Sequence, residues 1–179
     1  MTIALRRPWV RSIAAVSVGL AAAFALPFLV HLLPADGGPP QGARLLPIFY
    51  AGLVLVLRGA PIPALAVAVL APLLNRLLTG MPAGTMLPTV LLELVLFTLL
   101  LVLAVRVLPA SVARFLGPVA YLVASMIARP IVVPDVQPLA VLTTAVPVAW
   151  PGLLMLLAIG ALAGVTRNGA RRDQAVPRV

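Results

Sequence analysis

Six long apolar runs, separated by short polar or Pro/Gly-rich breaks, follow one another along the chain. A membrane helix needs about 20 mostly apolar residues, and Pro, Gly and Arg mark where such runs stop. The pattern therefore predicts an all-α bundle of six membrane helices at residues 12–33, 44–59, 61–79, 86–107, 112–130 and 140–165. The second run is short, so we expect that helix to tilt little or to cross incompletely.

The composition supports a protein of the lipid bilayer. Of the 179 residues, 63% are hydrophobic and 9% are charged, and the mean hydropathy is +1.17. A soluble domain has about a quarter of its residues charged. The absence of cysteine and the single histidine, His31, exclude thiolate and multi-histidine metal sites. We therefore expect no metal and no cofactor.

The positive charge is carried by thirteen arginines at the edges of the apolar runs, and the net charge is +9. In a soluble protein this excess would suggest nucleic acid, but here it indicates topology and contacts with anionic lipid headgroups. With the N-terminus inside, ten arginines lie on the cytoplasmic side: Arg6, Arg7, Arg11, Arg58, Arg106, Arg114, Arg167, Arg171, Arg172 and Arg178. Only Arg44, Arg76 and Arg129 then face outward.

This arginine bias predicts a multi-pass protein of the plasma membrane with both termini in the cytoplasm. We expect a cytoplasmic segment at residues 1–11, a membrane domain at 12–166 and a basic cytoplasmic tail at 167–179. A cleaved signal peptide is the alternative for the first run, but that run is longer than the 7 to 15 residues typical of a signal peptide's apolar region.

Polar side chains interrupt three of the predicted helices. Glu93 lies on the order of 10 Å below the outer surface if each helical residue adds ~1.5 Å. An ionised group near a helix centre costs roughly 2.5 to 3.5 kcal/mol and normally faces the bundle interior, where it has a partner. Thr89 and Phe97 share its helix face by i, i+4 spacing. The candidate solute-binding residues are Arg44, Asn75, Arg76, Thr79, Glu93, Tyr121, Ser125 and Arg129.

Two interpretations of these polar rows stay open. The rows of residues 75–79, 89–97 and 121–129 all lie in the predicted outer half, where they could converge on a cavity open to the exterior. Alternatively, Glu93 pairs with Arg76 or caps backbone groups and merely holds helices together. Three outward arginines favour an anionic solute, because a guanidinium matches a carboxylate bidentately.

Small residues form two rows on the first predicted helix. One row is Ser17, Ala21 and Ala25, and the row beside it is Ala15, Gly19 and Ala23. Small residues at this spacing let another helix approach closely in a bilayer. The rows serve either packing within the chain or docking of a partner's helices near Ser17, Ala21 and Ala25.

Motifs for catalysis are absent from the sequence. It contains no GxxxxGK[ST] loop for nucleotide phosphates, no HExxH and no Gly-x-Ser-x-Gly arrangement. We therefore expect a protein that is not an enzyme and has no ATPase site of its own. Uphill transport would then need a partner or an ion gradient.

Three segments resemble the substrate-binding S components of energy-coupling factor (ECF) transporters. They are LPIFYAG (46–52), APLLNRLLTGMPAGTMLPTVLLELVLF (71–97) and AWPGLLMLLAIGAL (149–162). The resemblance implies six helices, an outward-facing pocket, and a complex with a transmembrane coupling protein and two ABC-type ATPases. The docking motif of the family would fall on Ser17 and Ala21, or on Ala21 and Ala25.

The resemblance also bears on the ligand. Relatives carry Pro-Met-His where this chain has Ala43, Arg44 and Leu45, so the ligand type stays open. Glu93 would lie at the pocket floor or brace a pocket arginine, beneath the turn at residues 79–82. The expected function is the binding of a vitamin or related micronutrient for import. The alternatives are a gradient-driven carrier or channel that acts alone through Glu93, and a membrane scaffold that transports nothing.

Overall fold

The computed structural model describes residues 8–32, 37, 39–84 and 86–175, and the side chains of the last helix as far as Ala163. Helices and their connections make up all of these residues, as the sequence predicts. The helices are α1 (Pro8–His31), α2 (Gln41–Leu45), α3 (Pro47–Leu57), α4 (Pro61–Thr79), α5 (Leu87–Val107), α6 (Ala110–Ala113), α7 (Gly117–Val132) and α8 (Pro138–Ala175).

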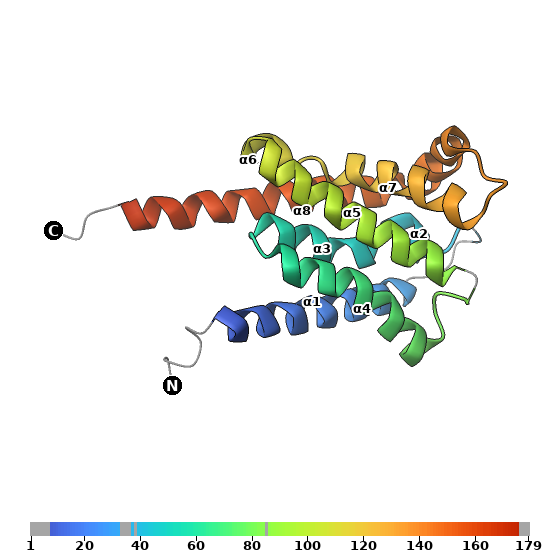
Figure 1. The fold of residues 1–179 in the computed structure, drawn as a ribbon, viewed down its shortest axis with the longest axis horizontal. Coiled ribbons are helices and arrows are strands. Elements are labelled where there is room, and N and C mark those ends of the chain that lie inside the picture. The colour runs from blue at the N-terminus through green and yellow to red at the C-terminus, as the bar shows by residue number, and fades with distance from the viewer. Residues whose placement is uncertain (1–7, 33–36, 38, 85, 176–179) are drawn as a thin grey trace.

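The longer helices lie roughly along one axis and alternate in direction (Figure 1). Helices α1, α4 and α7 point one way and α3, α5 and α8 the other, so α1 starts at the end of the molecule where α8 finishes. Within the described residues, α1, α4, α5 and α8 up to Ala163 are long and apolar enough to cross a membrane. These four helices indicate a membrane protein. The apolar stretches Gln41–Leu57 and Gly117–Val132 are shorter, so six complete spans remain a prediction.

Proline and glycine set the helix boundaries. Pro in the first helical turn loses no hydrogen bond and has a suitable φ, and it stands at the first or second position of six helices: Pro8, Pro47, Pro61, Pro88, Pro118 and Pro138. Gly80 ends α4 in the left-handed conformation at φ 74°, which glycine adopts without steric cost.

Two predicted runs are divided in the structure. The run at 44–59 breaks at Leu46, which takes the left-handed conformation at φ 54° between α2 and α3. The run at 112–130 contains the end of the short helix α6 and then α7, which starts only at Gly117. Leu46 directly precedes Pro47, and the second break precedes the Gly117-Pro118 pair, so each new helix begins with a proline in its first turn.

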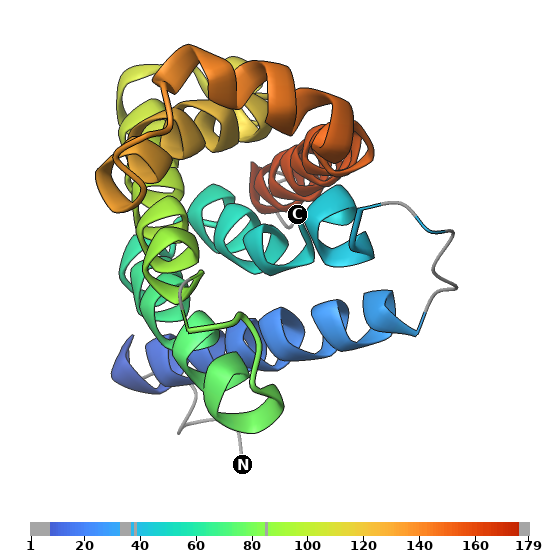
Figure 2. The same cartoon turned by 90° about the vertical axis from the view of Figure 1, so that its right-hand side faces the viewer.

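Helix α3 lies at the centre of the bundle. Seen from the end of the bundle, α1, α4, α5, α7 and α8 follow one another around it (Figure 2), and α3 contacts α1, α4, α5 and α8. Its side chains are buried on every side, including Phe49, Leu53 and Val56. A helix that is apolar all round is a buried helix, which explains why this short segment forms the core.

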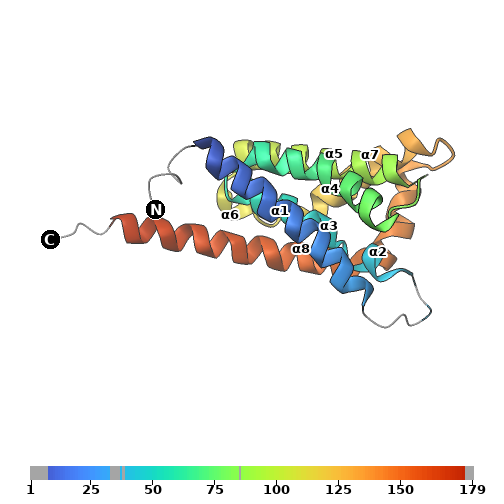
Figure 3. The same cartoon turned by 90° about the horizontal axis from the view of Figure 1, so that it is seen from below.

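The two small-residue rows of α1 have different environments. Helix α1 crosses the bundle obliquely (Figure 3). Gly19 and Ala23 are buried, and a Cβ at Gly19 would lie 2.8 Å from Val67 Cγ2 of α4. That row therefore packs within the chain. Ser17, Ala21 and Ala25 are exposed, so the other row has no such role among the described residues.

Helix α8 extends beyond the bundle at the end where α1 starts (Figures 1 and 3). The sequence predicts its end near residue 165, but the helical backbone continues to Ala175. This extension carries Arg167, Arg171 and Arg172. Arg58 and Arg106 also lie at this end of the molecule, in the α3–α4 turn and the last turn of α5. The basic end is thus opposite the C-terminal ends of α1, α4 and α7.

Candidate functional site

Glu93 and Arg129 form an ion pair between α5 and α7. Arg129 Nε donates to Glu93 Oε1 over 3.0 Å. The Glu93 side chain is only 7% exposed, and that of Arg129 is 31% exposed. Glu93 lies near the start of α5 and Arg129 in the last turn of α7, at the end opposite the basic one (Figure 1). The buried carboxylate therefore has an interhelical partner, and that partner is Arg129 rather than Arg76.

Tyr121 and Ser125 continue the polar row of α7 below Arg129. Both are buried, with relative exposures of 3% and 0%. The Tyr121 hydroxyl is close enough to interact electrostatically with Glu93, Arg129 and Ser125, although Ser125 Oγ makes no hydrogen bond of normal geometry. The predicted row at i, i+4 spacing thus faces the bundle interior and joins the ion pair.

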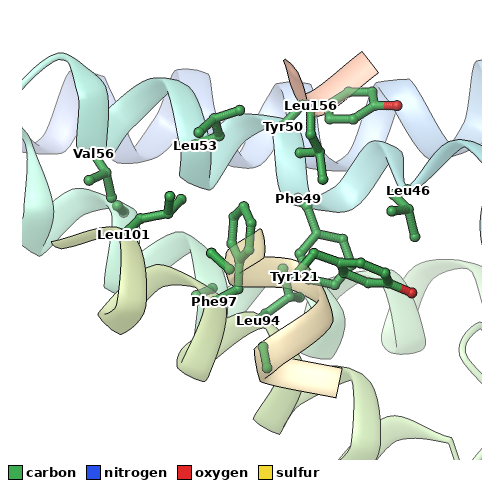
Figure 4. Packing of buried hydrophobic residues seen from close by; sticks show 14 of the residues in the cluster. Leu46, Phe49, Tyr50, Leu53, Val56, Leu94, Phe97, Leu101, Tyr121 and Leu156 are labelled. Carbon is green, nitrogen blue, oxygen red and sulfur yellow. The ribbon is translucent and has the colours of Figure 1, made fainter. Parts of the chain in front are cut away.

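Three aromatic rings lie beside this polar group. The ring of Phe49 on α3 meets those of Phe97 and Tyr121 edge to face, each at 5.1 Å between centroids. The Tyr121 hydroxyl points away from Phe97 (Figure 4). Tyr121 therefore belongs to an aromatic cluster through its ring and to the polar group through its hydroxyl. Phe49 was not among the predicted site residues, although it lies in the segment LPIFYAG.

The polar residues of α4 make their hydrogen bonds elsewhere. Asn75 Nδ2 donates to the main-chain oxygen of Ala23 on α1 over 3.3 Å. Thr79 Oγ1 donates to the Asn75 main-chain oxygen over 2.7 Å and accepts the N–H of Met81. The α4 row therefore ties α4 to α1 and shapes its own C-terminus.

Arg76 is exposed and bonds to the turn that follows α4. Its Nη1 donates to the main-chain oxygens of Gly80 at 2.5 Å and Pro82 at 3.3 Å. Hydrogen bonds thus unite the rows of α5 and α7 but do not bring in the row of α4. A cavity shared by all three rows stays a prediction.

Arg44 lies on α2, a short helix that contacts both α1 and α8. Its side chain is half-buried. A Cβ at Gly152 of α8 would lie 2.7 Å from both the Arg44 main-chain oxygen and Leu46 Cγ. Only glycine fits this contact, so Gly152 allows the segment around Arg44 to lie directly against α8.

The Glu93–Arg129 pair keeps hydrogen-bonding groups that its own contact does not use. No group of three or more His, Cys, Asp or Glu that could hold a metal ion occurs in the described part of the chain. The 3.0 Å bond uses one N–H of a guanidinium that has five and one oxygen of a carboxylate that has two. The pair therefore retains capacity to donate and to accept, and its summed charge is zero.

The three segments that carry the ECF resemblance meet in the core. Phe49 of 46–52 contacts Phe97 of 71–97, and Leu46 contacts Gly152 of 149–162. Neither the protein-family models nor the curated proteins nor the solved structures that were compared with the chain give a match. The candidate site is therefore defined by its geometry: an ion pair on α5 and α7, a buried hydroxyl group and an aromatic cluster.

Proposed function

We propose that this protein is the substrate-binding S component of an ECF-type importer for a vitamin or related micronutrient. One observation carries the proposal. The buried Glu93 carboxylate is paired with the half-buried Arg129 toward the end of the bundle opposite the basic one, and the polar group continues through Tyr121 to an aromatic cluster. By the positive-inside rule that end faces the exterior, where an importer receives its solute. The polar group would orient the solute and the aromatic rings would bind its flat or apolar part.

The partners in this proposal are a transmembrane coupling protein and two ABC-type ATPases. Support comes from α1, where Gly19 and Ala23 are used for internal packing. Ser17, Ala21 and Ala25 remain exposed, so a second helix could approach α1 closely along this row. The ATPases supply the energy that the chain itself has no motif to provide.

Identification of the co-purifying solute tests the proposal most directly. The full-length protein is purified in mild detergent, and small molecules released on denaturation are identified by mass spectrometry. We expect one compound of vitamin size at close to one equivalent per chain. A preparation that retains no such compound, and that binds none from a panel of micronutrients, would contradict the proposal.

Substitutions of Arg129 and Arg76 distinguish the proposed site from the neighbouring end of α4. Arg129→Gln leaves the buried Glu93 carboxylate without its cationic partner and removes donors from the polar group. We expect solute affinity to fall by tenfold or more, corresponding to at least about 1.4 kcal/mol. Arg76→Gln is the matched control, because Arg76 bonds to its own turn, and it should change affinity less than twofold. Equal losses of solute affinity for the two variants in calorimetric titrations would contradict the assignment of the solute to the α5–α7 site.

The partner is tested with a bulky residue on the exposed row of α1. Ala21→Leu should abolish capture of the coupling protein in a pull-down from membranes. Ala158→Leu, at an exposed alanine of α8, is the control and should leave capture unchanged. A complex that survives Ala21→Leu would show that the partner docks elsewhere, without affecting the solute proposal.

A carrier that acts alone is the second candidate function, because Glu93 is a buried carboxylate inside a membrane bundle. Such residues mark proton and cation pathways. Purified protein in liposomes distinguishes the two. Solute accumulation driven by a proton gradient, with no ATPase present, would favour the carrier, and loss of that uptake in Glu93→Gln would identify its coupling residue.

A further inference from the structure

A cavity opens at the basic end of the molecule, remote from the Glu93–Arg129 pair. Its volume is about 300 Å³, and it is lined by Arg11, Ser12 and Ala15 of α1 together with residues 59–63. Those residues form the turn between α3 and α4 and the first positions of α4. The starts of two apolar helices, one of them with a guanidinium, thus flank a single open hollow.

The walls of this cavity differ in polarity. Arg11 supplies a permanent positive charge, and Ser12 supplies a hydroxyl whose donor bonds to the Pro8 main-chain oxygen over 3.2 Å. Opposite them, Pro61, Ile62 and Pro63 are apolar, and Ile62 is 78% exposed. The cavity therefore combines one cationic side with an apolar side that continues onto the outer surface of the bundle.

Two neighbouring residues indicate that the cavity lies at the level of the lipid headgroups. Trp9, two residues before Arg11, is 57% exposed, and tryptophan is enriched at membrane–water interfaces. Arg58 lies in the turn directly before the lining residue Gly59. The arginine count assigns this end to the cytoplasmic side, the leaflet that is rich in anionic lipid.

We propose that this cavity binds the phosphate headgroup of an anionic phospholipid. Arg11 would contact the phosphate, since a guanidinium offers a planar pair of N–H donors to phosphate oxygens. The glycerol and acyl part would lie against Pro61 and Ile62. A soluble phosphate would make no use of this apolar wall. The site requires a membrane-embedded bundle but does not depend on the proposed transport function.

Native mass spectrometry of the full-length protein tests the site. The protein is released from detergent in the presence of phosphatidylglycerol or phosphatidylcholine with identical acyl chains, and bound lipids are counted over a range of lipid concentrations. We expect tighter binding of phosphatidylglycerol. Arg11→Gln should weaken it about fivefold, which corresponds to about 1 kcal/mol for one basic residue near an anionic surface.

Two further variants distinguish lipid binding in the cavity from a general effect of positive charge at this end of the molecule. Arg106→Gln removes an exposed arginine from the last turn of α5, outside the cavity lining, and should change binding less than twofold. Ala60→Leu fills the cavity without changing charge and should weaken binding as Arg11→Gln does. Melting temperatures in detergent verify that each variant remains folded.

Three results would overturn the assignment. Equal losses in Arg11→Gln and Arg106→Gln would show that only net charge matters. Unchanged binding in Ala60→Leu, with the variant folded, would place the lipid outside the cavity. Displacement of phosphatidylglycerol by millimolar inorganic phosphate would identify a site for a soluble phosphate instead.

Discussion

The polar row of α7 and the polar row of α4 are alike in the sequence and different in the structure. Each places hydroxyl, amide or guanidinium groups at four-residue spacing near the same end of the bundle. On α7, Arg129 reaches across to Glu93 of α5. On α4, Thr79 bonds to its own helix and Arg76 to the turn behind it. Only the α7 row forms a charge contact between helices.

The difference follows from the available partners. Glu93 is a buried carboxylate, and in an apolar bundle such a group requires a cation. Arg129 can satisfy it from the facing helix. Arg76 instead precedes Gly80, where the chain turns and exposes main-chain oxygens at the helix end, and a cation near a helix C-terminus stabilises those carbonyls. A polar row is therefore a candidate site when it faces an opposite charge on another helix, as the α7 row does.

Removal of the Glu93 carboxylate should have the largest effect. Glu93→Ala leaves Arg129 half-buried without its partner, and we expect the free energy of unfolding to fall by about 2 kcal/mol. This is below the 3 to 5 kcal/mol typical of fully buried pairs, because the Arg129 side chain remains 31% exposed. Unfolding of the protein in mixed micelles by increasing SDS measures the change.

The double variant Glu93→Leu with Arg129→Met is the control for this prediction. It removes both charges, so no unpaired ion stays inside the bundle, and the loss should be smaller than in Glu93→Ala alone. If the single and double variants lose the same stability, the effect comes from packing around α5 and not from the ion pair.

Asn75 should have an intermediate effect, because its hydrogen bond joins two helices without a charge. Asn75→Leu keeps the size of the side chain and removes the donor to the Ala23 oxygen. We expect a loss of about 1 kcal/mol, in the range for a neutral hydrogen bond between helices. Leu74→Ala, at the neighbouring and partly exposed position, should cost less in the same SDS titration. A larger loss for Leu74→Ala would mean that lipid-facing packing outweighs the Asn75 bond.

Much of the fold could be predicted from apolar runs and prolines. The run at 61–79 coincides with α4, and that at 86–107 differs from α5 by one residue at its start. The breaks at Leu46 and before Gly117 were not predicted. Apolar residues flank both points directly, and the left-handed conformation of Leu46 is accompanied by buried contacts with α8 that a pattern of apolar runs does not reveal.

The candidate site could be predicted in part. Four-residue spacing identified the inward row of Tyr121, Ser125 and Arg129, and the rarity of membrane carboxylates identified Glu93. Spacing alone could not say which arginine pairs with Glu93, because this depends on which helices are neighbours. Contacts between α5 and α7, and between α1 and α4, decide that Arg129 reaches the carboxylate and that Asn75 faces α1.

Thr79 should have the smallest effect and provides the most sensitive test of the contrast between α7 and α4. Within the described part of the chain its hydroxyl bonds to Asn75 and Met81, both within four residues, and its side chain is exposed. Thr79→Val keeps the shape and should change the free energy of unfolding by less than about 0.5 kcal/mol, as expected for an exposed substitution. Solute affinity should also stay within twofold of the wild type, because no hydrogen bond links Thr79 to the Glu93–Arg129 pair. A tenfold loss of affinity with unchanged stability would instead bring the end of α4 into the binding site, as the sequence predicts, and would remove the distinction between the two rows.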